Sequence, residues 1–173
     1  MKIPVGKEYF DEIRRDHAYY VDKTELLYQL VEGTSNEVTL FTRPRRFGKT
    51  LMLSMMENFF SIQKSDSRGL FDGLNIMEHA EFCDEWMNQY PVLFVTLKGV
   101  EALSFEEAYK TLLVRLSELC KKNRYLADSE KVDADDKKVF LNLAEKKAEL
   151  AEVKDSLKTI MRMMAAHYGK QVR

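Results

Sequence analysis

The sequence is poor in the residue types that build disulfide scaffolds and metal centres. Its 173 residues include only 2 cysteines, Cys83 and Cys120, and 3 histidines, His17, His79 and His167. None of them stands at the spacing of a metal-ligand motif. Two distant cysteines without a CxxC pair are typical of reduced thiols in a cytoplasmic protein. We therefore expect a cytoplasmic location and neither a disulfide framework nor a zinc site.

The chain also lacks an excess of charge of either sign and any long apolar run. Its 27 Lys and Arg nearly cancel its 28 Asp and Glu, so no global field attracts nucleic acid or an acidic membrane surface. The first ten residues hold no apolar run of signal-peptide length, and about 18 uninterrupted apolar residues occur nowhere. With 45% hydrophobic and 32% charged positions, the composition is that of one globular domain without a membrane partner.

A strand, a tight loop and a helix are predicted in direct succession in the first third of the chain. Residues 38–42, VTLFT, form a short β-rich run typical of a strand buried on both faces. Residues 48–62 then carry apolar side chains at helical spacing. Before the strand, residues 21–33 predict a helix with Asp22 as its cap, Glu25 as the capping-box partner and Gly33 at its end.

The rest of the chain predicts one more strand and several helices. Residues 90–99, YPVLFVTLKG, read as a strand with its apolar run at 92–97. Ser104 and Glu107 have capping-box spacing and open a helix to about Lys122. Residues 123–136 are polar and acidic, which predicts a surface linker, since the offsets of an EF-hand are absent. Two further helices follow at 137–148 and 152–168, the second with Val153, Leu157, Ile160, Met161 and Met164 on one side.

The loop between the first strand and its helix has the chemistry of a phosphate site. Its sequence, TRPRRFGKT at residues 42–50, is a degenerate form of GxxxxGK[ST], because Arg43 occupies the first glycine position. Backbone amides at a helix N-terminus donate to phosphate oxygens, and Gly48 permits their close approach. Lys49 is placed to reach the outer phosphates and Thr50 to ligate Mg²⁺.

We assign the whole loop to a nucleoside triphosphate site. The predicted contacts are Arg43, Pro44, Arg45, Arg46, Phe47, Gly48, Lys49 and Thr50, with Thr50 as the metal ligand. The three arginines leave alternatives open. Their guanidinium groups suit phosphate contacts in a nucleotide. They equally suit solvation, pairing with acidic neighbours or contact with DNA phosphates.

Three segments of the chain resemble a known family. YYVDKTELL at Tyr19–Leu27, LFTRPRRFGKTL at Leu40–Leu51, and YPVLFVTLKG with the following SFEEA at 90–108 are similar to motifs of the AAA-ATPase-like family of bacterial proteins. The likeness extends over essentially the whole chain. Arg43 and Pro44 in place of the first glycine are themselves typical of this family. The resemblance implies that Lys49 and Thr50 bind the nucleotide and magnesium. It assigns no role to Tyr19–Thr24.

The resemblance also implies what this chain does not contain. Relatives continue, after a segment like HYGKQV, into a strand whose acidic pair holds magnesium and activates water, whereas this sequence stops at Arg173. We expect residues 1–173 to be the incomplete N-terminal portion of one P-loop domain, and hydrolysis to depend on the missing downstream sequence. Relatives often carry a nuclease-like domain downstream, which links the family to defence or nucleic-acid processing by analogy alone.

The predicted fold class is α/β: a partial, helix-rich three-layer P-loop NTPase fold with few parallel strands. Its strand edges would need cover from a second copy or a downstream domain. Two rival functions stay open beside ATP binding. One is a non-catalytic interaction module that docks a partner through the 152–168 helix. The other is a nucleic-acid binder that uses Arg43, Arg45 and Arg46.

Overall fold

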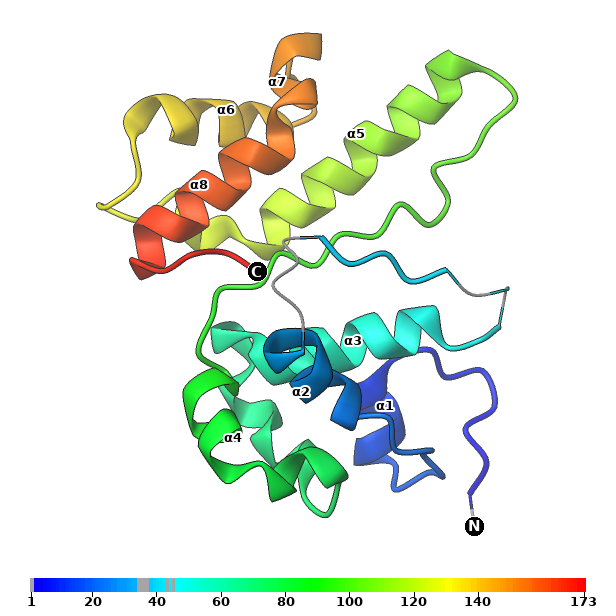
Figure 1. Cartoon of the computed structure of the whole chain (residues 1–173). Coiled ribbons are helices and arrows are strands. Elements are labelled where there is room, and N and C mark those ends of the chain that lie inside the picture. The colour runs from blue at the N-terminus through cyan, green and yellow to red at the C-terminus, as the bar shows by residue number, and fades with distance from the viewer. Residues whose placement is uncertain (1, 34–37, 43, 45) are drawn as a thin grey trace. The chain divides into compact units, whose positions relative to one another are not determined.

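The computed structural model describes residues 2–33, 38–42, 44 and 46–173. Arg43 and Arg45, two of the predicted site residues, lie outside this part of the chain. The structure divides into two compact units, Met1–Val92 and Leu93–Arg173, each with its own hydrophobic core (Figure 1).

The first unit is built from short helices around a buried central helix, α3. Its described elements are α1 (Phe10–Arg15), α2 (Glu25–Glu32), α3 (Lys49–Phe60), the 3₁₀ segments η1 (Ile62–Phe71) and η2 (Asn75–Glu78), and α4 (Ala80–Trp86). The core gathers the apolar side chains of all these elements: Phe10, Leu27, Met55, Phe59, Phe71, Leu74, Ile76, Phe82, Cys83 and Met87. Phe59 is fully buried and contacts the rings of Phe71 and Phe82, so α3 is fixed by aromatic packing.

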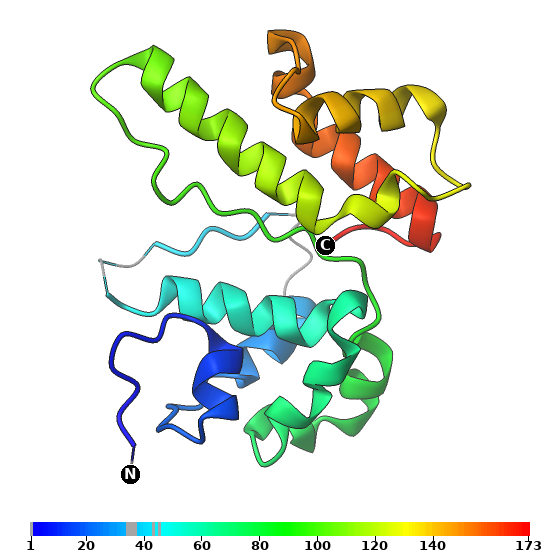
Figure 2. The same cartoon turned by 180° about the vertical axis from the view of Figure 1, so that it is seen from behind.

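The second unit is a small helical bundle. Its elements are α5 (Phe105–Lys122), η3 (Arg124–Leu126), α6 (Ala134–Ala144), α7 (Leu150–Lys154) and α8 (Ser156–Tyr168). In this unit α6 packs against both α5 and α8, which Figure 2 shows from behind. As predicted, Ser104 caps α5, and its hydroxyl accepts the Glu107 amide at 3.3 Å. Gly169 ends α8 in the left-handed conformation.

Two details of the second unit correct the sequence prediction. Residues 123–136 are only partly a surface linker, because Leu126 within η3 is fully buried and Asp136 binds Arg162 of α8. The buried face of α8 is also shifted from the predicted one. Met163 is fully buried, while Leu157 and Met161 are about 40% exposed. The buried face runs through Val153, Ser156 and Ile160 at helical spacing, and a pattern of apolar residues alone misses it because Ser156 is polar.

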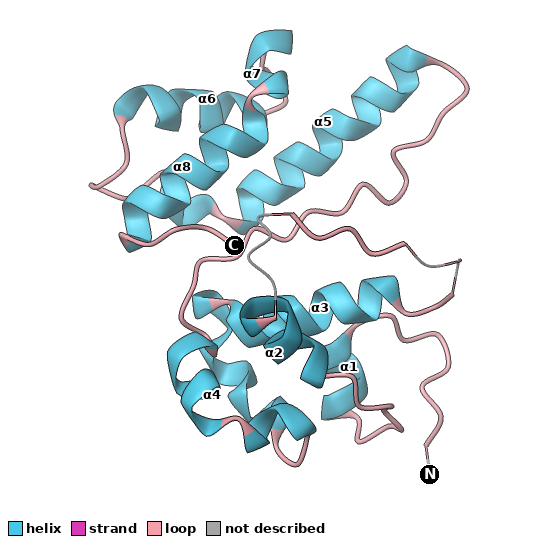
Figure 3. Cartoon of the chain, viewed as in Figure 1, coloured by secondary structure: helices cyan, strands magenta, loops and turns pink. Residues whose placement is uncertain are grey.

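The predicted α/β fold with parallel strands is wrong. Among the described residues the structure holds no strand or sheet, only one isolated parallel bridge between Ser61 and Tyr90 (Figure 3). Residues 38–42 and 92–97 belong to no strand, and Val38 is 84% exposed instead of buried on both faces. The physical reason is that an apolar, β-branched run encodes only a preference. A strand needs a partner to complete its ladder, and the described residues supply none.

The start of α2 also differs from the prediction. The helix begins at Glu25, not at residue 21, and Asp22 lies before it in an extended segment. Glu25 makes no capping box, because its carboxylate contacts the His79 Nε2 atom at 3.0 Å. The His79 ring in turn stacks on Tyr28 at 3.9 Å, so tertiary contacts have replaced the local cap.

None of the helices in the described part of the chain combines the length and apolar character that a membrane span requires.

Candidate functional site

The N-terminus of α3 is the centre of the candidate site. Gly48 precedes the helix with φ 76° and ψ 22°, a left-handed conformation that glycine adopts without the strain of a Cβ atom. The first hydrogen bond of the helix runs from the Met52 amide to the Gly48 carbonyl at 2.9 Å. By helix geometry, the amides before Met52 point out of the N-terminus, where the dipole favours an anion.

The residues just before Gly48 turn sharply and face solvent. Arg46 also has a positive φ of 68°, so left-handed residues stand on both sides of Phe47. Pro44 and Arg46 are exposed, and the Phe47 ring is 61% exposed. Alternating conformations of this kind turn successive amides toward one side, which is the geometry of anion-binding nests.

Lys49 and Thr50 occupy the first turn of α3. The Lys49 ammonium group donates a hydrogen bond to the Pro44 carbonyl at 3.2 Å. This bond links the first turn of α3 back to the preceding loop. Lys49 is half-buried, and Thr50 is exposed. Both side chains therefore stand at the helix terminus where an oxyanion would lie, as the motif predicts.

Two cavities of the first unit touch this loop. One, of about 420 Å³, is lined at the loop by Arg46, Phe47 and Gly48. The other, of about 320 Å³, is lined there by Phe47, Gly48 and Lys49. Lys23, from the extended segment before α2, lines both. The loop thus borders partly open cavities of the size that small ligands occupy.

The Tyr19–Thr24 segment, to which the family resemblance assigns no role, has two different faces. Tyr19, Val21 and Lys23 are exposed, whereas Tyr20 and Asp22 are half-buried and Thr24 is fully buried. This alternation is that of an extended segment. Tyr19, Val21 and Lys23 all line the 420 Å³ cavity, which Arg46, Phe47 and Gly48 of the 42–50 loop also line.

The inward face of the same segment is held by hydrogen bonds. The Asp22 carboxylate accepts the Thr24 amide at 2.8 Å and the Asn75 amide at 2.7 Å, and the Thr24 hydroxyl accepts the Ile76 amide at 3.2 Å. Burial alone would raise the pKa of Asp22, but these donated hydrogen bonds outweigh it, and the pKa is lowered.

Tyr20 is fixed in the same way. Its hydroxyl lies 3.1 Å from the Met55 sulfur, and burial raises its pKa to about 12, so the phenol stays neutral.

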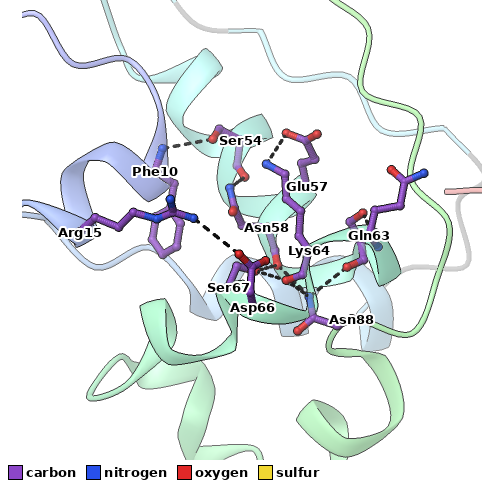
Figure 4. A network of polar contacts seen from close by, with 11 residues as sticks. Phe10, Arg15, Ser54, Glu57, Asn58, Gln63, Lys64, Asp66, Ser67 and Asn88 are labelled. Atoms are coloured by element: carbon purple, nitrogen blue, oxygen red, sulfur yellow. Dashed lines mark hydrogen bonds and ion pairs between the residues drawn. The ribbon is translucent and has the colours of Figure 1, made fainter. Parts of the chain in front are cut away.

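The opposite end of α3 is clamped by a network of buried polar groups (Figure 4). The Asn88 side-chain amide donates to the carbonyls of Asn58, Ser61 and Lys64 at 3.0 to 3.1 Å. The Ser67 hydroxyl donates to the Asn58 carbonyl at 2.7 Å. Asn88 itself has φ 57°, a left-handed conformation that asparagine tolerates better than most residues. This network fixes the helix whose other end carries Gly48.

Ser54 extends the network to α1. Its hydroxyl accepts the amide of Phe10, the first residue of α1, at 3.1 Å, so α3 supplies the cap that α1 lacks in its own sequence. No sequence pattern signals this contact or the Asn88 clamp, because each joins residues that are 24 or more positions apart.

The described residues contain no group of three or more His, Cys, Asp or Glu side chains that could hold a metal ion. Thr50 therefore fits magnesium only as one ligand of an ion that phosphate oxygens and water also coordinate, which is how proteins usually hold Mg²⁺. Both cysteines are buried free thiols, and burial raises the pKa of Cys120 to about 12, which makes it unreactive.

Comparison with known proteins gives one family and one relative. The family model for AAA-ATPase-like proteins, described as predicted AAA-ATPase, matches residues 4–173. An uncharacterized protein in the vnfD 5′ region of Azotobacter chroococcum mcd 1 is 35% identical over 99 residues. This match covers 57% of the chain but only 17% of the relative. No solved structure matches the chain.

Proposed function

Because the chain belongs to the AAA-ATPase-like family, we propose that its 42–50 loop binds the phosphates of ATP, with Thr50 as a ligand of the accompanying Mg²⁺. The observation that carries the proposal is the left-handed Gly48 at the N-terminus of α3, followed at once by Lys49 and Thr50. Amides, an ammonium group and a hydroxyl then stand together where a polyphosphate needs them.

The charges around the loop favour an anion. Lys23, Arg46 and Lys49 are among the described residues that line the two cavities, and none of these lining residues is an aspartate or glutamate. A polyphosphate would therefore meet cations and amides without a repelling carboxylate.

The residues that line the two cavities suit ATP binding better than ATP hydrolysis. A carboxylate that holds magnesium and orients the attacking water is a standard part of P-loop catalysis. The described cavity linings supply none. We infer that this site binds ATP and that hydrolysis requires an acidic residue contributed from elsewhere, as the family resemblance implies.

Lys49→Ala tests the proposal by calorimetric titration with a non-hydrolysable ATP analogue and Mg²⁺. Loss of a charge-assisted contact of about 1.5 to 3 kcal/mol weakens binding by roughly tenfold or more. Lys158→Ala is the matched control, because Lys158 is an exposed lysine on α8 of the second unit. Circular dichroism verifies that both variants keep their helices. Unchanged affinity in Lys49→Ala contradicts phosphate binding by this loop.

A further inference from the structure

The 420 Å³ cavity joins the phosphate loop to the signature segment. Phe47 and Gly48 line it from the loop, and Tyr19, Val21 and Lys23 line it from the outward face of the extended segment. Its volume lies within the range of about 300 to 1,000 Å³ that small-molecule sites occupy. A ligand whose phosphates lie on the amides near Gly48 therefore has a partly open cavity directly beside them.

The lining of this cavity suits a flat aromatic group. It includes the rings of Tyr19, Tyr20 and Phe47, and the flexible side chains of Met52 and Met55. Aromatic rings stack on nucleobases, and methionine adapts to irregular apolar shapes. Tyr19 is 51% exposed, so its ring has accessible surface, whereas Tyr20 is held by Met55 and by an edge contact with Phe10.

The signature segment is held in place beside the cavity. Asp22 and Thr24 fix it by their bonds to Asn75 and Ile76. Tyr19, Val21 and Lys23 line the cavity from the same segment, so the fold sets their position relative to a ligand there.

We propose that this cavity receives the base of the nucleotide whose phosphates the 42–50 loop binds, with Tyr19 as the stacking ring. The inference rests on the proposed function and gives the Tyr19–Lys23 signature its role. The inward residues of the signature hold the segment, and the outward residues contact the nucleoside. Lys23 lines both cavities, so its ammonium group is available to the phosphates as well as to the nucleoside.

The test compares two probes, ATP and inorganic tripolyphosphate, each titrated with Mg²⁺ into wild type, Tyr19→Ala and Val21→Trp. In Tyr19→Ala, loss of the stacking ring lowers the affinity for ATP by about tenfold, which lies within the range measured for one base stacked on one aromatic side chain. Val21→Trp fills the cavity and lowers the affinity for ATP by a similar factor. Both variants bind tripolyphosphate within about twofold of wild type, because that probe has no base.

Phe105→Ala is the control, since Phe105 is an aromatic residue of the second unit that is 81% exposed. It leaves both affinities unchanged. Equal affinity of ATP for wild type, Tyr19→Ala and Val21→Trp would overturn the base site, as would equal weakening of both probes. Lys49→Ala separates the two proposals, because it weakens both probes whenever the loop binds phosphate. A wild-type chain that binds neither probe refutes the phosphate site and the base site together.

Discussion

The two ends of α3 differ in how far the protein itself satisfies their terminal backbone groups. At the C-terminal end, each of the last four carbonyls accepts a hydrogen bond. The donors are the Ser61 amide to Glu57, the Asn88 and Ser67 side chains to Asn58, the Asn88 amide to Phe59, and the Tyr90 amide to Phe60. At the N-terminal end, Gly48 provides no side-chain cap within the described part of the chain.

The difference shows which end is structural and which is available. A helix end that is buried has to satisfy its carbonyls within the protein, whereas an exposed N-terminus leaves its amides to solvent or to an anion. In α3 the clamped end lies against the aromatic core, and Gly48 and Thr50 are exposed. We infer that the clamp gives the helix a fixed position, which is what a phosphate site at its other end requires.

Asn88→Asp gives the largest expected effect on this comparison. The substitution keeps the shape of the side chain but removes both amide donors and directs a carboxylate at three carbonyl oxygens. We expect the free energy of unfolding to fall by about 3 kcal/mol, measured by urea denaturation, because carbonyls are left unsatisfied and a charge is repelled.

Asn88→Gly distinguishes the hydrogen bonds from the backbone conformation. Glycine accepts φ 57° without strain, so this variant loses only the hydrogen-bond donors. We expect its free energy of unfolding to fall by about 1 to 2 kcal/mol. If the left-handed conformation were the sole role of Asn88, glycine would be neutral. Both variants should also weaken ATP binding in the folded protein, because the clamp fixes the position of α3, and unchanged affinity would show that the two ends of the helix are independent.

A pair of glycine substitutions is expected to have the next largest effect. Gly48 precedes α3 with φ 76° and Gly169 follows α8 with φ 66°, and in neither case does any described atom lie within 4 Å of an added Cβ. Alanine at either position therefore meets backbone strain without a clash, and each variant loses about 1 to 2 kcal/mol of stability in thermal unfolding.

Only Gly48→Ala should also lower the affinity for ATP, because a Cβ atom and an altered φ at that position disturb the amides of the proposed phosphate site. Gly169→Ala is its matched control in the second unit. Equal ATP affinity in the two variants would remove Gly48 from the site.

How much of this could be predicted from the sequence differs between local and distant interactions. The helices of residues 49–60 and 105–122 follow from apolar spacing and caps, and the turn at Gly48 follows from the FGKT motif. The strands at 38–42 and 92–97 were wrong because a strand depends on a partner that no local pattern encodes.

The candidate site divides along the same line. Gly48, Lys49 and Thr50 stand at the helix terminus where the motif puts them, and ATP binding by them remains a prediction. The outward position of Tyr19 could have been inferred from the alternating pattern of YYVDKT, but the cavity that it lines together with Phe47 could not. A sequence period gives the two faces of a segment and does not say what either face contacts.

The smallest expected effect concerns the segment that borders the N-terminal end of α3. The pKa of Asp22 in the folded protein lies below the unfolded value of 3.8, so its ionised carboxylate stabilises the fold above about pH 4. That contribution disappears as the pH falls through the lowered pKa. Asp22→Asn removes the charge and keeps an acceptor oxygen for only one of the two amides, because Thr24 and Asn75 donate to different carboxylate oxygens. We expect a loss of about 0.5 to 1 kcal/mol near neutral pH and a smaller difference from wild type at about pH 3. Urea unfolding of both proteins across this range measures the difference, and a gap that is constant or widens toward acid would mean that the charge of Asp22 does not hold the signature in place.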